Sequence, residues 1–378
     1  MNRYFFELLQ IAIGNRKELT RKLTDEEWES LYGICEKQTL LGIAFAAVER
    51  LPKEQYPPFE VLAEWVHDAQ VVKERNEKLN AECEALARHL KHDGLWSCIL
   101  KGQSNLVNYP EYLRECRTAG DIDVWCAPIS KQNKGERKVI EYALSCSRAV
   151  NQPVPEVRYH HVELDNVYPV DVEIHHRPSF MCSPLRNIRL RDWCRKFEGA
   201  NEIACVDGHK FPVPSVSFNA VYQLVHIYRH LFDEGIGLRQ ILDYYFVLCR
   251  LGEERLETRD ECLRQIERFG MKRFASAMMY VLQTVFAMPD KYLICLPNKE
   301  EGKFLLSETM QAGNFGRYDE RIKRVEGSCS CMKVQWNHAF EKWKHNLRLI
   351  AHYPEEVLWE PIFRVYHLVW RKCGLWKV

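Results

Sequence analysis

Two aspartates at alternate positions of a predicted strand have the clearest capacity for chemistry. They are Asp121 and Asp123 in the segment Gly-Asp-Ile-Asp-Val, which starts at Gly120. Successive side chains of a strand point to opposite faces, so both carboxylates share one face while Ile122 and Val124 point to the core. Two carboxylates about 7 Å apart along a strand suit hard cations such as Mg²⁺. The alternative interpretation is a pair of solvated acids at a strand end.

A second acidic strand is predicted at residues 170–175, which read Val-Asp-Val-Glu-Ile-His. Its apolar residues alternate with Asp171, Glu173 and His175, which share the opposite face. In the same small sheet, this strand would bring a third carboxylate beside the first two. Carboxylates this close stay ionised only with a cation between them, because otherwise one takes up a proton. The alternation leaves open whether Asp171 or Glu173 is the third acid.

A polar turn, Lys101-Gly102-Gln103-Ser104, follows a short apolar strand predicted over residues 95–100. Glycine lets the backbone approach a ligand closely, and backbone N–H groups at the start of the next short helix attract anions. Ser104 is placed to contact a terminal phosphate. The turn therefore predicts a phosphate-binding element one strand and one helix before the acid pair.

The order of these motifs resembles the nucleotidyltransferase superfamily typified by DNA polymerase beta. The segments LKGQSNLVNYP, RTAGDIDVW, VEIHHRP and LVHIYRH…GLRQILD look more closely like the bacterial family of uncharacterised nucleotidyltransferases, over about residues 60 to 250. The superfamily turn is usually Gly-Gly or Gly-Ser, whereas here the serine comes one place later. The residues that carry the resemblance are Leu100, Lys101, Gly102, Tyr109, Pro110, Arg117, Asp121, Asp123, Glu173 and His175.

The resemblance implies a metal-dependent nucleotidyltransferase that moves an NMP from an NTP, with ATP the expected one, to a hydroxyl acceptor. It implies that Asp121, Asp123 and Glu173 are catalytic and bind Mg²⁺ or Mn²⁺, and the acid–apolar–His pattern favours Glu173 over Asp171. The expected nucleotide-binding residues are Lys101, Gly102, Gln103, Ser104 and Arg117. The expected substrate contacts are Asp171, His175, His226, His230 and Arg239.

Two histidine pairs have alternative interpretations. His226 and His230 lie four residues apart on a predicted helix, where the spacing suits either a transition metal or packing between helices, while the resemblance implies substrate contacts. His160 and His161 are adjacent on a predicted hairpin strand, so alternation places only one of them on the cleft side.

The predicted elements indicate an α+β protein with a small mixed sheet between N-terminal helices and a C-terminal helical bundle. We expect a helical region at 1–78, a nucleotidyltransferase-like core at 79–214 and a helical domain at 215–378. Thr24 and Glu27 form a capping box, and a long helix is predicted over about 59–92. Strands 156–164 and 167–175 are predicted to form a hairpin with a tight turn at Asp165-Asn166, and 178–215 is predicted as loop with short strands. The C-terminal helices are expected near 217–232, 237–251, 255–269, 272–287, 300–310, 333–351 and 357–372.

Composition excludes several classes of protein. The chain has 378 residues, 46% apolar and 12% aromatic, so extensive disorder is excluded. Its 53 Lys and Arg against 52 Asp and Glu give a formal charge of +1, which argues against bulk nucleic-acid binding. The sequence has no apolar run long enough to span a bilayer. Its 15 cysteines form no Cys-x-x-Cys pair and indicate reduced, mostly buried thiols. We expect a cytoplasmic protein.

Two other functions stay open. One is a catalytically inactive nucleotide-binding or interaction module on the same fold, although the presence of all three acids argues against it. The other is a metal-dependent phosphohydrolase, which would need more histidine ligands near the acids than the sequence indicates.

Overall fold

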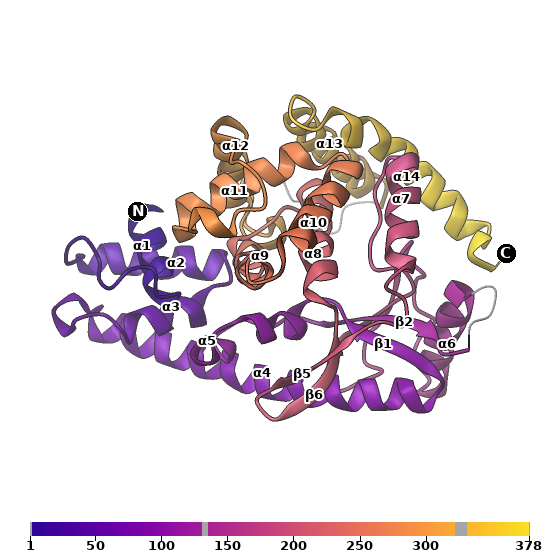
Figure 1. The fold of residues 1–378 in the computed structure, drawn as a ribbon, viewed down its shortest axis with the longest axis horizontal. Helices are drawn as coiled ribbons and strands as arrows, with labels where there is room; N and C mark the ends of the chain where they lie inside the picture. The colour runs from indigo at the N-terminus through magenta and orange to yellow at the C-terminus, as the bar shows by residue number, and fades with distance from the viewer. Residues whose placement is uncertain (1, 131–134, 322–330, 378) are drawn as a thin grey trace.

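The computed structural model describes residues 2–130, 135–321 and 331–377, except for the side chains of 331–339. The fold contains a four-stranded mixed sheet in the order β1-β2-β4-β3. Its strands β1 and β2 lie between α4 (Phe59–His92) and the C-terminal helices (Figure 1). Strand β2 is antiparallel to β1 and parallel to β4, and β3 is antiparallel to β4. The chain from β2 to β4 contains helix α6 (Gly135–Ala149), as expected because parallel strands need a crossover. The strands are β1 (Leu95–Ile99), β2 (Ile122–Pro128), β3 (His161–Leu164) and β4 (Val172–His175).

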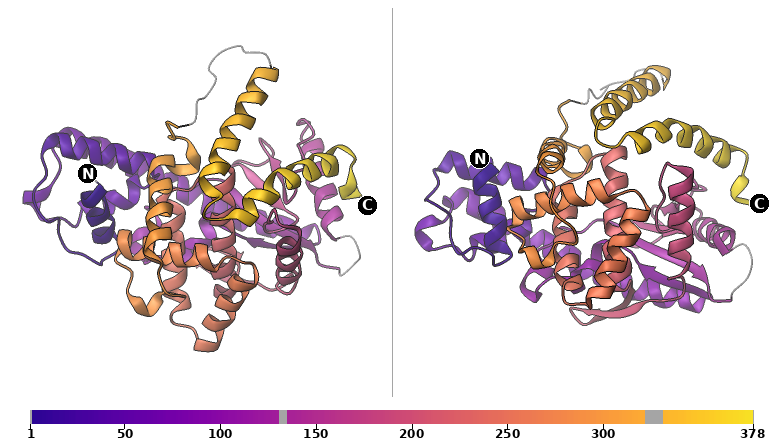
Figure 2. Two further views of the ribbon diagram at one scale, coloured as in Figure 1. Left: turned by 90° about the horizontal axis from the view of Figure 1, so that it is seen from above. Right: turned by 45° about the horizontal axis from the view of Figure 1, so that its top comes forward.

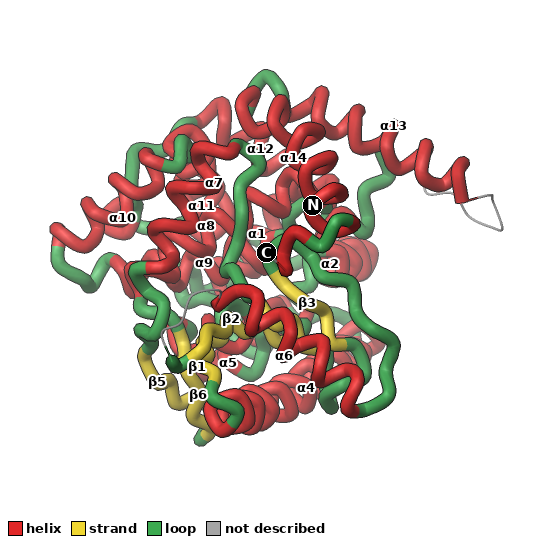
Figure 3. Tube along the Cα trace, turned by 90° about the vertical axis from the view of Figure 1, so that its right-hand side faces the viewer, coloured by secondary structure: helices red, strands yellow, loops and turns green. Residues whose placement is uncertain are grey.

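Helices cover both faces of this sheet (Figure 3). On one face, Val124 of β2 packs in a hydrophobic core with Leu86 of α4 (Phe59–His92) and Ile140 of α6. On the other face, the ring of Trp125 stacks on Phe218 of α8 (Val216–Asp233), with 5.7 Å between their centroids. Asp123 shares the face of Trp125, so the acidic face of the sheet looks toward α8.

A larger hydrophobic core joins the N-terminal helices to the C-terminal ones, and includes Trp28, Trp65 and Phe274. The remaining N-terminal helices are α1 (Asn2–Ala12), α2 (Asp25–Lys37), α3 (Leu41–Val48) and α5 (Glu111–Arg114). The remaining C-terminal helices, of which α13 and α14 lie on the outside (Figure 2), are α9 (Leu238–Leu251), α10 (Leu256–Arg268), α11 (Lys272–Phe286), α12 (Lys299–Ala312), α13 (Cys331–Leu349) and α14 (Pro354–Lys372). Short 3-10 helices are η1 (Lys53–Gln55), η2 (Gly102–Asn108), η3 (Asp290–Tyr292), η4 (Asn314–Gly316) and η5 (Leu375–Lys377).

The α+β class predicted from the sequence is confirmed. Thr24 and Glu27 form the predicted capping box of α2, and α4 has the predicted bounds. Helix α4 runs through residue 78, where the N-terminal region was expected to end, so one helix belongs to both regions. The division into three domains stays a prediction. Among the described residues, no helix has both the length and the apolar character that a bilayer span requires.

Two local predictions are wrong. The strands β3 and β4 are shorter than predicted and are joined by residues 165–171, not by a two-residue turn, because the register pairs Leu164 with Val172. Pro169 in this connection has no N–H to donate to a strand ladder, and Asn166 has a left-handed φ of 57°. The segment predicted as loop with short strands does contain β5 (Glu202–Val206) and β6 (His209–Val213), but it also holds helix α7 (Pro184–Arg195).

Helix α7 was missed because its apolar face is narrow. Only Leu190, Trp193 and Cys194 carry its buried apolar contacts, while four arginines dilute the periodicity. Pro184 occupies its first turn, where the missing N–H costs nothing.

Candidate active site

The central feature of the site is a pair of carboxylates on adjacent parallel strands. The register of β2 and β4 sets Asp123 directly beside Glu173. Neighbouring strands lie about 4.8 Å apart, so the two acids lie close together on the face toward α8. Asp123 is 1% exposed and Glu173 is partly buried. Asp121 lies just before β2 and is also partly buried, whereas Asp171 lies just before β4 and is exposed.

Two cations compensate these acids. The ammonium Nζ of Lys101, in the turn after β1, lies 3.0 Å from Oδ2 of Asp123. The ring nitrogen Nε2 of His175 lies 2.9 Å from Oδ1 of Asp123 and 3.2 Å from Oε2 of Glu173. The backbone N–H of Leu100 donates to the carbonyl of Asp123 (2.9 Å), which ties the lysine turn to β2.

The charges of this cluster shift its pKa values. Burial alone would lower the pKa of His175, but its hydrogen bonds to Asp123 and Glu173 and their charges raise it to about 9. Burial would also lower the pKa of Lys101, which the charges of the three acids raise instead. Burial would raise the pKa of Glu173, but His175, His161 and Lys101 hold it well below its usual range. At neutral pH Glu173 is therefore ionised, and Lys101 and His175 are protonated.

The stability of the metal-free protein should therefore depend on pH through His175. Its pKa is about 9 in the folded protein and about 6.5 in the unfolded chain, so its contribution is complete below pH 6.5 and is lost as the pH rises through 9. We expect a loss of about 3 kcal/mol at most in the free energy of unfolding between pH 6 and pH 10. Urea titrations in EDTA measure it.

The matched variants for this pH dependence are His175→Gln and His209→Gln. The first should flatten the decline between pH 6.5 and 9. The second removes a partly exposed histidine that contacts Glu84 at 3.3 Å, and should keep the wild-type profile. An unchanged profile in His175→Gln would contradict the charged state that we assign to His175.

Two further histidines join the acids. The ring nitrogen Nδ1 of His161 lies 3.0 Å from Nε2 of His160 and 3.5 Å from Oε2 of Glu173, while its Nε2 lies 3.2 Å from Oε1 of Glu163. Alternation predicted that only one of the two histidines faces the cleft, and this is wrong. His160 lies just before β3, where the alternation of side chains along a strand does not apply. The rings of His160 and His161 therefore both contact the ring of His175.

The donor set fits a divalent cation. Asp123, Glu173 and His175 each offer a ligand atom, and these atoms lie within 4.8 Å of one another. Two other groups of this kind lie beside it among the described residues, one of His160, His161 and His175, and one of His161, Glu163 and Glu173. Lys101 already holds a positive charge at Asp123, where a metal ion would bind. The sequence analysis missed Glu163 and placed only one of His160 and His161 on the cleft side, because the approach of these residues depends on the antiparallel pairing of β3 with β4.

The predicted nucleotide-binding turn points partly into the protein. Gly102 has a φ of 66°, a left-handed conformation that favours glycine. The side-chain amide of Gln103 donates to the side-chain oxygens of Asn80 (2.6 Å) and Asn76 (3.3 Å) on α4. Ser104 is 1% exposed, and its hydroxyl has no hydrogen-bond partner among the described residues. Lys101 is thus the residue of this turn whose side chain contacts the acid site, at Asp123.

Arg117 is held by a buried ion pair. Its Nε and Nη2 each lie 2.7 Å from a carboxylate oxygen of Asp243 on α9, and the hydroxyl of Tyr109 donates to the same carboxylate (2.7 Å). Arg239, one turn before Asp243, is 8% exposed and donates to the carbonyl of Thr118 (2.9 Å). Burial, and then the charge of Arg117, lowers the pKa of Arg239 to about 10, against the opposing charges of Asp243 and Asp121. Arg239 therefore carries its charge near the acid site.

Helix α8 brings His226 and His230 over the acidic face of the sheet. Both are buried, with their ring centroids 4.4 Å apart. Burial is the largest cause that lowers the pKa of His226, and the charges of Lys101 and His175 lower it further. The serine cap at Ser215, whose hydroxyl accepts from the N–H of Phe218 (3.4 Å), starts this helix. These positions fit the predicted substrate contacts, which stay a prediction.

Comparison with known proteins gives one family and one structure. The family model described as "Uncharacterised nucleotidyltransferase" matches residues 24–287. No curated protein matches the chain. Among solved structures, the chain is similar to an antigenic nucleotidyltransferase-like protein from Paracoccidioides brasiliensis at 10% identity and a TM-score of 0.29, over 56% of this chain and 97% of that one.

Proposed function

Because this chain belongs to the family of uncharacterised nucleotidyltransferases, we propose that it transfers an NMP from an NTP to a hydroxyl acceptor and releases pyrophosphate. The observation that carries this proposal is the pairing of Asp123 with Glu173 on adjacent strands, beside Lys101 and His175. ATP is the expected donor, and the acceptor is a hydroxyl-bearing group that the fold alone does not identify.

The acids have distinct roles in this reaction. Asp121, Asp123 and Glu173 hold Mg²⁺ or Mn²⁺, which when bound neutralises charge on the phosphates. The acceptor oxygen bonds to the α-phosphorus as the bond to the β-phosphate oxygen breaks, and pyrophosphate leaves. Glu173, which the strand register sets directly beside Asp123, accepts the hydroxyl proton. Lys101, once released from Asp123, contacts the triphosphate, because its ammonium lies at the acids on the turn that is expected to bind the nucleotide.

A second candidate function gains support from His160, His161 and His175. A cluster of imidazoles beside carboxylates is a ligand set typical of transition metals. Such a centre would suit hydrolysis of a phosphate ester, in which water replaces the hydroxyl acceptor.

One experiment separates these functions. The protein is incubated with each of the four α-labelled NTPs, Mg²⁺ or Mn²⁺, and a mixture of hydroxyl-bearing metabolites. Release of pyrophosphate with the label on an acceptor, or on the protein itself, supports transfer. Hydrolysis of phosphate esters without pyrophosphate release would favour the phosphohydrolase. NTP binding without any product would favour the inactive module.

A further inference from the structure

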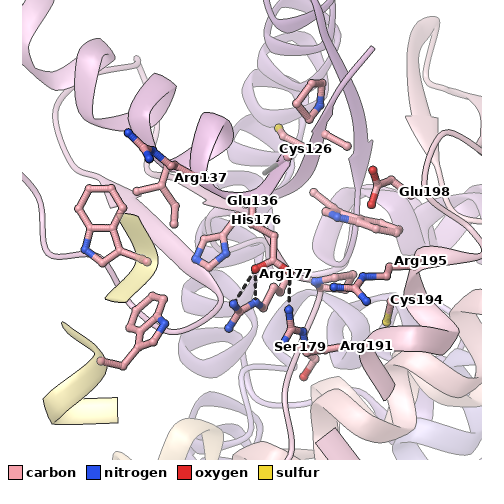
Figure 4. Close-up of a pocket in the computed structure, with 18 of the residues that line it drawn as sticks. Cys126, Glu136, Arg137, His176, Arg177, Ser179, Arg191, Cys194, Arg195 and Glu198 are labelled. Carbon is pink, nitrogen blue, oxygen red and sulfur yellow. Dashed lines mark hydrogen bonds and ion pairs between the residues drawn. The ribbon is translucent and has the colours of Figure 1, made fainter. Parts of the chain in front are cut away.

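A cavity of about 740 Å³ begins where β4 ends. Strands β2 and β4 pair as far as Trp125 and His175, and the cavity is lined by the rest of β2 and by the segment that follows β4. Helices α6 and α7 and the C-terminal residues Trp370 and Trp376 complete its walls (Figure 4). Its wall begins at Trp125, which pairs with His175 and is two residues, or about 7 Å along the strand, beyond Asp123. The described lining contains none of the acids of the active site, nor Lys101 or His175, and the cavity has a size typical of small-molecule pockets.

Positive charge dominates the described lining of this cavity. It comprises four arginines against two glutamates, namely Arg137, Arg177, Arg191, Arg195, Glu136 and Glu198. Arg177 and Arg191 converge on one carboxylate, because the nitrogens of Arg177 lie 2.6 and 2.8 Å from Glu136 and Nη2 of Arg191 lies 3.0 Å from it. Burial would raise the pKa of Glu136, but the two arginines lower it to about 2, so this carboxylate is ionised. One carboxylate between two guanidinium groups leaves a net positive charge.

Arg191 and Arg195 lie four residues apart on α7, so they share one face of the helix. Arg195 is the more open of the two: its side chain is 59% exposed and its ion pair with Asp192 spans 3.4 Å. In Figure 4, Arg177 and Arg191 both point to Glu136. The pair on α7 can therefore offer guanidinium donors to an anion without dismantling the contact of Arg177 with Glu136.

Buried polar atoms in the same wall lack partners. The hydroxyl of Ser179 and Nδ1 of His176 have no hydrogen-bond partner among the described residues, although the two side chains are 2% and 4% exposed. Nε2 of His176 lies 3.3 Å from the carbonyl of Arg158, which assigns the ring proton to Nε2 and leaves Nδ1 as an acceptor. Buried polar groups of native proteins are normally paired, and the hydroxyl of Ser179 can donate to an oxygen of an anion bound in the cavity.

We propose that this cavity binds a small organic anion, whose phosphate or carboxylate group contacts Arg191 and Arg195 and whose planar part packs on the tryptophans of the wall. The proposal goes beyond the proposed function, because this binding requires neither an NTP nor a metal ion. Phosphate and carboxylate share the bidentate recognition that arginine provides.

Calorimetric titration of the full chain in EDTA, without NTP, tests the proposal. The probes are phenyl phosphate, benzoate and the uncharged benzyl alcohol. We expect at least one of the two anions to bind and benzyl alcohol not to bind, with an affinity that falls as salt is raised. Binding of phenyl phosphate alone would assign the site to phosphate esters, and binding of benzoate alone would assign it to carboxylates.

Matched arginine variants locate the binding. Arg191→Gln and Arg195→Gln should each weaken the anion at least tenfold. Arg189→Gln, on the same helix but outside the lining, should bind as the wild type does. Because the side chain of Arg195 is exposed, we expect Arg195→Gln to fold as the wild type does. The proposal would be overturned if neither anion binds or if benzyl alcohol binds equally well. Unchanged anion affinity in both Arg191→Gln and Arg195→Gln would also overturn it.

Discussion

Glu173→Gln should abolish NMP transfer, with a rate loss of at least about a hundredfold, whereas Asp171→Asn should change the rate by only a few-fold. The register of β2 and β4 explains the difference. Glu173 is level with Asp123 and within 3.2 Å of His175, whereas Asp171 lies before the strand and is exposed. Replacing a metal-binding carboxylate by an amide removes its negative charge and one of its two ligand oxygens. A solvated carboxylate does not bind the metal, so the same replacement changes the rate little. Initial rates of pyrophosphate release at saturating Mg²⁺ measure both variants.

The two substitutions control for each other, because each removes one charge from the same strand region. Equal melting temperatures would show that neither rate change reflects unfolding. A reversed ranking would move the third metal ligand to Asp171. Wild-type rates in both variants would contradict the mechanism with three carboxylates.

Patterns local in sequence predicted much of the fold. Helix α4 has its predicted ends because Pro58 precedes it and Gly94, with a left-handed φ of 80°, follows it. The acidic strands were identified because an alternating pattern places Asp121 and Asp123 on one face without knowledge of any partner strand. The choice of Glu173 over Asp171 depended on the resemblance to a family, and the register now supplies a physical reason for it.

Contacts between distant segments could not be predicted in this way. The partner of Arg117 is Asp243 on α9, and the docking of that helix depends on the packing of the whole C-terminal bundle. Arg117 was expected to bind the nucleotide because the family resemblance includes an arginine just before the acid pair. The contact of Gln103 with Asn80 on α4 could not be predicted either, nor could the contact of the His160 ring with the His175 ring.

The contact of Lys101 with Asp123 changes what removal of the Asp123 carboxylate should do. Repulsion between acids alone would predict that an amide stabilises the metal-free protein. Asp123, however, is 1% exposed and contacts both Lys101 and His175. Breaking a buried ion pair by removing one partner costs about 3–5 kcal/mol, because the remaining charge is left uncompensated. Glu173 and Asp121 stay near Lys101, so we expect a loss near the lower end of that range.

Asp123→Asn should therefore lower the melting temperature of the metal-free protein and also remove most of its response to Mn²⁺ with ATP. A ligand present at 100 times its dissociation constant stabilises the native state by about 2.7 kcal/mol, so the wild type should gain several degrees. The variant should gain little, because Asp123 is the buried carboxylate of the proposed metal site. Asp171→Asn is the matched control and should keep both the starting temperature and the increment. Thermal unfolding with and without EDTA measures both effects, and a full increment in Asp123→Asn would exclude Asp123 as a metal ligand.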